Sequence, residues 1–262
     1  MDFIVVYKLL TVPVVILITT YLVKRWGAFV GGIFAGLPIF SGPTSFFITL
    51  EQGAEFSYLS SYSNLIGLLG SAVTALLYAW IAYFGGKFWF ALPCAILGYF
   101  LTSYLLHFLP EFSSIVIVLA CSSCLIAHIF LPRPKVENFS TTRPRWIVWV
   151  QILFGSFMVY SITEAAEFLG PQWSGTISCY PVMITVLAPF THIANGVYTT
   201  IAVLRGLAAG WLGTAVFACM VMLTVRHYHI SFVYVLAGTL SCASTVIYSL
   251  LVMHFDKKRN MN

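Results

Sequence analysis

Residues 35–53, A-G-L-P-I-F-S-G-P-T-S-F-F-I-T-L-E-Q-G, carry the strongest structural signal in this sequence. Two glycines and two prolines, at Gly36, Pro38, Gly42 and Pro43, interrupt a stretch that is otherwise largely apolar. Proline removes a backbone hydrogen-bond donor, and glycine allows the chain to unwind. The pattern therefore predicts a helix that is broken near its middle.

The composition around this segment is that of a membrane protein. Of the 262 residues, 60% are hydrophobic and 8% are charged, whereas soluble domains carry about 25% charge. This composition excludes a cytosolic enzyme, a secreted disulfide scaffold and a disordered protein. The predicted fold class is all-α and polytopic, with membrane lipid as a partner. The net charge of +5 is too dispersed along the chain to indicate nucleic acid.

Apolar segments separated by polar breaks predict about nine transmembrane helices, since each span needs roughly 20 apolar residues. Their ranges are 3–23, 27–50, 63–84, 88–108, 112–131, 146–168, 174–197, 206–225 and 230–253. The first segment is followed by Lys24 and Arg25 and lacks a small-x-small cleavage site. We therefore expect it to be an uncleaved first helix.

The basic residues predict the orientation of these spans. With the N-terminus outside and the C-terminus in the cytoplasm, 11 of the 13 basic residues lie on the cytoplasmic side, as the positive-inside rule requires. They are Lys24, Arg25, Lys87, Arg133, Lys135, Arg143, Arg145, Arg205, Lys257, Lys258 and Arg259. Lys8 and Arg226 are the exceptions. Six of the eight acidic residues then lie toward the outer side.

The chain divides into two halves that resemble each other. Residues 1–131 form a first unit of five spans, 132–145 a polar cytoplasmic linker, and 146–262 a second unit of four spans. A shift of 140 residues superposes Gly70 on Gly210 and Thr74 on Thr214. An odd number of spans separates the copies, so we expect an inverted-topology repeat, which is typical of secondary transporters. The alternative is that small residues recur by chance.

A family resemblance starts from the same segments. Ala35–Pro43, followed by a helix that reaches Gly53, resembles the second-helix region of the small GlpM-type bacterial inner-membrane proteins. The segment Ser174–Pro181, which leads through His192 to Gly196, is similar. The resemblance implies a bacterial inner-membrane location and a duplicated, fused unit, and it implies nothing about substrate. The five-plus-four arrangement departs from a simple four-helix unit.

The two broken helices form the predicted substrate site, because paired interruptions in the two halves of a chain point to the binding site of a transporter. The candidate residues are Gly36, Pro38, Ser41, Gly42, Pro43, Ser174, Gly175, Ser178, Tyr180 and Pro181. Their hydroxyl groups suit a neutral or zwitterionic polar solute. The alternative is that both breaks are kinks that only shape the bundle.

Ionisable residues beyond the breaks are candidates for proton or ion coupling. Glu51 and Gln52 follow the first break, and His192 follows the second. Glu51 and Glu55 are four residues apart and should share one helical face, while Glu164 lies at the outer end of the sixth span. We expect Glu51 and His192 to couple protons or to gate the outer mouth. The alternative is that these groups are only solvated at the membrane interface.

Other motifs are weaker. Cys121 and Cys124 form a C-x-x-C pair inside a span, without a second pair that would complete a zinc site. Arg205 is expected to anchor the topology. The sequence contains no glycine-rich phosphate loop, H-E-x-x-H or G-x-S-x-G, so no catalytic residue, metal or cofactor is predicted.

The predicted function is an inner-membrane secondary transporter that moves a small polar or amphiphilic solute by alternating access, with proton coupling as one option. Two alternatives stay open. One is an integral-membrane enzyme or flippase that acts on lipid-linked substrates. The acidic residues at one face favour it, and the basic residues at the opposite face count against it. The other is an accessory subunit of a membrane complex. A homodimer is compatible with all of these.

Overall fold

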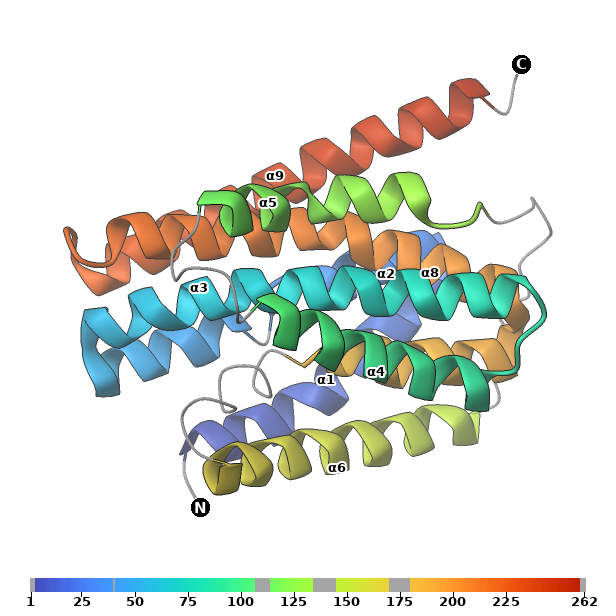
Figure 1. Ribbon diagram of the computed structural model, residues 1–262, viewed down its shortest axis with the longest axis horizontal. Coiled ribbons are helices and arrows are strands. Elements are labelled where there is room, and N and C mark those ends of the chain that lie inside the picture. The colour runs from blue at the N-terminus through green and yellow to red at the C-terminus, as the bar shows by residue number, and fades with distance from the viewer. Residues whose placement is uncertain (1–2, 40, 107–113, 134–144, 170–179, 260–262) are drawn as a thin grey trace.

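Every secondary-structure element in the described part of the computed structural model is a helix, which confirms the all-α class. The structure describes residues 3–39, 41–106, 114–133, 145–169 and 180–259. The helices are α1 (Phe3–Trp26), α2 (Ala28–Gly36), α3 (Ser41–Tyr83), α4 (Phe88–Leu106), α5 (Ser114–Phe130), α6 (Arg145–Leu169), α8 (Val182–Thr224) and α9 (Ile230–Arg259) (Figure 1).

The outside of the bundle is apolar, as in a protein embedded in a membrane. Leu97 of α4, Leu153 of α6 and Val235 of α9 are each about two-thirds exposed, at 68%, 70% and 67%. Within the residues that the structure describes, five helical stretches are long and apolar enough to cross a membrane. They are Ala28–Phe47, Thr49–Tyr83, Phe88–Leu106, Val182–Thr224 and Ile230–His254, with shorter apolar helices at Ile117–Phe130 and Trp146–Ser161.

Helix α3 reverses its direction at Gly53, which has φ 85° and ψ 175°. Ser45 and Ser57 would be roughly 18 Å apart along a straight helix. Their hydroxyl oxygens nevertheless lie 2.7 and 2.9 Å from the same Tyr234 hydroxyl. Residues 41–52 therefore form a first limb that folds back against a second limb, 54–83 (Figure 1).

Helix α8 repeats this geometry. Gly196 has φ 83° and ψ 177°, and it separates a first limb of residues 182–195 from a second limb of residues 197–224. The two reversals lie at opposite ends of the bundle (Figure 1). Both glycines sit in a region of backbone conformation that residues with a side chain rarely adopt, and each leaves open space where a Cβ would lie.

The second limbs of α3 and α8 run antiparallel. Tyr78, near the end of α3, contacts His192, just before the α8 reversal. At the other end of the bundle, Phe217 of α8 packs against Tyr234 of α9, whose hydroxyl contacts Ser57 just after the α3 reversal. The start of one second limb therefore lies beside the end of the other.

Helix α2 crosses the second limb of α8 at very short range. Each carries a G-x-x-x-G pattern, Gly32/Gly36 in α2 and Gly206/Gly210 in α8. A methyl group at Gly32 would overlap the carbonyl oxygen of Val203, and one at Gly206 would lie 2.9 Å from the Cα atom of Gly32. Small residues at such a crossing allow backbone-to-backbone packing between membrane helices.

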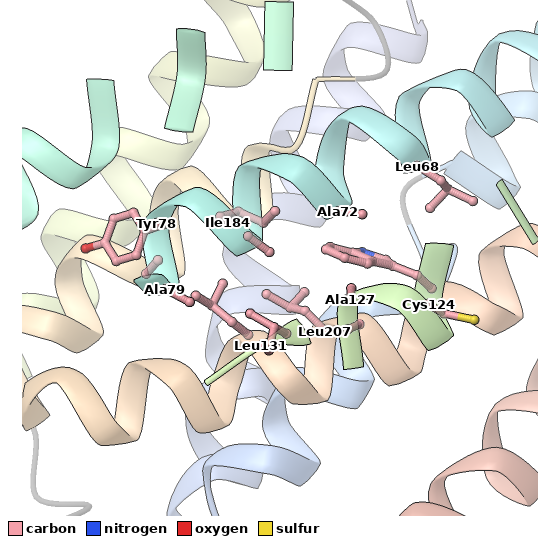
Figure 2. Packing of buried hydrophobic residues seen from close by; sticks show 14 of the residues in the cluster. Leu68, Ala72, Tyr78, Ala79, Cys124, Ala127, Leu131, Ile184 and Leu207 are labelled. Atoms are coloured by element: carbon pink, nitrogen blue, oxygen red, sulfur yellow. The ribbon is translucent and has the colours of Figure 1, made fainter. Parts of the chain in front are cut away.

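The main apolar core lies between α3, α5 and α8. Figure 2 shows its buried side chains pointing toward one another from these helices. They include Leu68, Ala72, Tyr78 and Ala79 of α3, Cys124 and Ala127 of α5, Leu131 just beyond it, and Ile184 and Leu207 of α8. Both limbs of α8 contribute, so this core holds the α8 hairpin in place.

Candidate functional site

The first predicted break is present between α2 and α3. Leu37 leaves the helical conformation, with φ −67° and ψ 157°, and its N–H donates to the carbonyl of Phe34. The chain then turns through Pro38 and re-enters a helix at Ser41, with the N–H of Gly42 donating to the carbonyl of Pro38 at 2.8 Å. The break therefore lies among the predicted residues Gly36, Pro38, Ser41, Gly42 and Pro43.

The carbonyl that the break frees at Gly36 has a partner on another helix. Thr214 of α8 donates its hydroxyl hydrogen to this oxygen at 2.9 Å. The crossing of α2 and α8 lies directly beside it, because Gly36 packs against Gly210, one turn before Thr214. In lipid, a broken helix is tolerated where protein groups satisfy the freed backbone, and here one threonine does so.

The second predicted break is described only at its end, because Ser174, Gly175 and Ser178 lie outside the described residues. Pro181 directly precedes α8. The ring of Tyr180 packs against Tyr99 and Phe100 of α4, and its hydroxyl accepts a hydrogen bond from Thr185 at 2.9 Å. Tyr180 therefore packs this segment against α4, and its hydroxyl oxygen is engaged by Thr185.

Four hydroxyl groups meet where α3 reverses. The Tyr234 oxygen lies 2.7 Å from Ser45, 2.6 Å from Thr49 and 2.9 Å from Ser57. Thr49 donates its hydrogen to the carbonyl of Ser45, so its oxygen must accept from Tyr234. Ser45 and Ser57 then donate to Tyr234. This arrangement uses all four hydroxyl hydrogens, and the resulting hydroxyl clamp ties both limbs of α3 to α9.

The acidic residues beside this reversal lie at the surface. Glu51 and Gln52 are exposed at the end of the first limb. Glu55 lies on the second limb, so the expectation that Glu51 and Glu55 share one helical face is wrong, since the chain reverses between them.

Glu55 has a basic partner on the loop after α8. It pairs with Arg226 through two hydrogen bonds, one of them 2.9 Å long, and the Arg226 guanidinium lies 3.5 Å from the centroid of the Tyr58 ring. The hydrogen bond to Glu55 raises the pKa of Arg226 above its ordinary value. Arg226, one of the two exceptions to the positive-inside pattern, is therefore paired with an acidic residue.

His192 lies far from Glu51, and the two cannot gate one mouth as expected. His192 Nδ1 is 3.2 Å from the hydroxyl of Tyr78. Tyr78 follows Gly53 by 25 residues, about 37 Å along a helix. Glu51 and His192 thus lie near opposite ends of the bundle (Figure 1). The side chain of Glu164 lies outside the described residues.

A buried arginine joins α8 to the end of α5. Arg205 donates to the carbonyl oxygens of His128 at 3.2 Å and Leu131 at 3.3 Å. Its other terminal nitrogen lies 2.8 Å from His128 Nε2, which must accept because arginine has no acceptor. A cation at a helix C-terminus is favourable, so Arg205 positions α5 against α8.

The sequence pattern assigns no role to three residues that hold these features together, Thr214, Tyr78 and Tyr234. Thr214 enters the pattern only as a member of the repeat. Tyr78 and Tyr234 carry no local signal, because each acts on a residue more than 100 positions away. The one feature that distinguishes them is a tyrosine hydroxyl inside an apolar span, because a buried hydroxyl needs a hydrogen-bond partner.

Comparison with known proteins adds no assignment, because no family model, curated protein or solved structure matches the chain.

Proposed function

We propose that this protein is a membrane transporter that moves a small polar or amphiphilic solute by alternating access. The observation that carries this proposal is the pair of helix reversals at Gly53 and Gly196, which share one backbone geometry and lie at opposite ends of the bundle. Two similar units in opposite orientation can exchange conformations, and this exchange opens a central site to one side at a time.

The repeat that this proposal requires is supported in a register different from the one read from the sequence. The reversal glycines are 143 residues apart (196 minus 53), not 140, and this spacing pairs Gly67 with Gly210 and Gly70 with Gly213. The helices of the two units follow one another in the same order along the chain. α1 and α6 are antiparallel, as are α4 and α9 and the two second limbs (Figure 1). Helix α5 has no counterpart in this scheme.

The chain would cross the membrane nine times if each change in its direction begins a new crossing. They are α1, α2 with the first limb of α3, the second limb of α3, α4, α5, α6, a crossing that ends in the first limb of α8, the second limb of α8, and α9. An outer N-terminus and cytoplasmic C-terminus then agree with the distribution of basic residues. The GlpM-type resemblance suggests the bacterial inner membrane as the location.

The solute would bind between the first break and the start of α8. Two half-helices, the first limbs of α3 and α8, begin in this central region. Some of their first backbone N–H groups bond to the preceding turn, as Gly42 does to Pro38 and Val182 to Tyr180, and the others have no partner within the helix. Such N-termini favour acceptor groups. Together with the half-buried hydroxyl of Ser41, they suit a neutral or zwitterionic solute.

Coupling to protons or ions would involve the residues at the two ends of the bundle separately. Glu51 and Gln52 are exposed beside the reversal that we place at the outer end. His192 lies beside the other reversal, where it contacts Tyr78. Each would respond to the conformation of its own end, and no direct proton transfer between them is implied.

The test is electrical recording from proteoliposomes on a solid-supported membrane, with rapid jumps of amino acids, sugars and small amines. We expect at least one class to evoke a current that Pro43→Ala and Pro181→Ala reduce at least tenfold. Pro93→Ala, at an exposed proline inside α4 that belongs to neither break, should leave the current unchanged. Full activity of both break variants would contradict the site, and neither a current nor uptake of any of these solutes would contradict the function.

A further inference from the structure

Two thiols from distant parts of the chain lie together in the bundle. The sulfur of Cys121 in α5 is 3.5 Å from the sulfur of Cys219 in the second limb of α8, and both cysteines are free. They are 98 positions apart in the sequence. Cys124, the other member of the C-x-x-C motif, instead directs its thiol to the backbone carbonyl of Cys121 at 3.4 Å. The pair that the motif suggests is therefore not the pair that meets.

The surroundings of these thiols decide what can reach them. Both are half-buried at the edge of the main apolar core, while Val118 and Leu125 of α5 face outward. The site thus opens toward the apolar surface of the bundle. No group of three metal-ligating side chains occurs in the part of the chain that the structure describes. Two thiols alone are better suited to a covalent bond with each other than to a closed metal site.

We propose that Cys121 and Cys219 form an oxidisable dithiol site whose oxidant is a quinone dissolved in the membrane. The two thiols together lose two electrons and two protons, a sulfur–sulfur bond forms, and the quinone becomes a quinol. The sulfurs must approach from 3.5 Å to about 2.05 Å. A shift of this size lies within the reach of cysteine side-chain rotation.

The bond would join α5 to the limb of α8 that packs against α2. α8 carries one of the two helix reversals, so a covalent tie to α5 would restrain its movement. The effect on solute transport rests on the proposed function. The formation of the bond does not rest on the proposed function, because it depends only on the distance between the sulfurs and on access for the quinone.

A split-chain gel tests this site directly. A protease site placed in the 132–145 connection separates Cys121 from Cys219 on cleavage. Membranes that contain the full-length protein are treated with decylubiquinone, blocked with N-ethylmaleimide, cleaved and run without reductant. We expect the two fragments to migrate as one band and to separate after dithiothreitol. Mass spectrometry of the joined peptides then identifies the bonded cysteines in the unsubstituted protein.

The variants give the matched controls. Cys121→Ser and Cys219→Ser should each abolish the joined band, whereas Cys124→Ser and Cys242→Ser should retain it. Cys179, which lies outside the described residues, is on the same fragment as Cys219, so Cys179→Ser should also retain the band. Separate fragments in the quinone-treated protein, a bond in any other pair, or a joined band in Cys219→Ser would each overturn the proposal.

Discussion

Thr214 donates a hydrogen bond of 2.9 Å to the carbonyl of Gly36, the last residue of α2, across 178 positions of the chain. This bond satisfies a backbone group that the break in the helix would otherwise leave unpaired in an apolar environment. It also explains how an interrupted helix persists within the bundle. The break, the crossing of α2 with α8 and this threonine form one structural unit.

Replacing Thr214 by valine tests that unit. The change keeps the shape of the side chain and removes the donor, which should destabilise the protein by about 1–3 kcal/mol. The measurement is the apparent melting temperature in mild detergent. Thr74→Val is the control, because the buried Thr74 hydroxyl only returns to the carbonyl of Gly70 in its own helix. Equal melting temperatures for the two variants would contradict a special role for Thr214.

The close crossing of α2 and α8 makes a steric prediction. A methyl group at Gly32 or Gly206 would overlap backbone atoms of the other helix. Gly32→Ala and Gly206→Ala should therefore each destabilise the protein by roughly 1–3 kcal/mol, again measured by thermal unfolding in detergent. Gly238 in α9 has nothing within 4 Å of an added Cβ. Gly238→Ala should be neutral or slightly stabilising, and a similar loss there would undermine the steric explanation.

The two helix reversals predict that Gly53 and Gly196 are required because of their backbone angles and not because of a lack of space. Gly53 and Gly196 both have open space at the Cβ position but a φ near 84° with an extended ψ. Alanine there should cost of order 1–3 kcal/mol. Asparagine tolerates the ordinary left-handed region but not this one, so Gly53→Asn should be as harmful as Gly53→Ala. Recovery of thermal stability in the asparagine variant would show that the backbone angles are not what requires glycine.

The hydroxyl clamp predicts a local effect. Tyr234→Phe leaves Ser45 and Ser57 without their acceptor and Thr49 without its donor. We expect faster amide hydrogen exchange across residues 41–57 and a loss of about 1–3 kcal/mol. Tyr228→Phe, at an exposed residue between α8 and α9, is the matched control. If residues 41–57 exchange at the same rate in both variants, the clamp does not hold the α3 hairpin.

The sequence predicted the break but not the reversals. Glycines and prolines at 36–43 disrupt a helix through their own covalent structure, so the pattern is local and readable. Gly53 gave no comparable signal, because a glycine inside an apolar helix is usually only a weak point. Its positive φ lies where the chain folds back, beside the two limbs that Tyr234 of α9 joins. The expectation for Glu51 and Glu55 failed for the same reason, since it assumed a continuous helix.

The remaining features depend on contacts between distant segments. Tyr234 lies 177 positions from Ser57, and Tyr78 lies 114 from His192. A single sequence carries no pattern that links such pairs. The sequence predicts an inverted repeat at a shift of 140 residues, from a few identities that include a short G-x-x-x-T-A run. The reversal glycines define a spacing of 143, and local similarity among small residues could not distinguish the two.

Alternating access is tested most directly by measuring water access to the first break from each side of the membrane. Ser41→Cys and Thr214→Cys would be made separately in a background without the six native cysteines and treated with an impermeant thiol reagent from either side. The control is Leu250→Cys on the apolar outer surface of α9, which should stay unlabelled. We expect labelling of both break positions from both sides. Labelling from one side only, or from neither, would contradict alternating access.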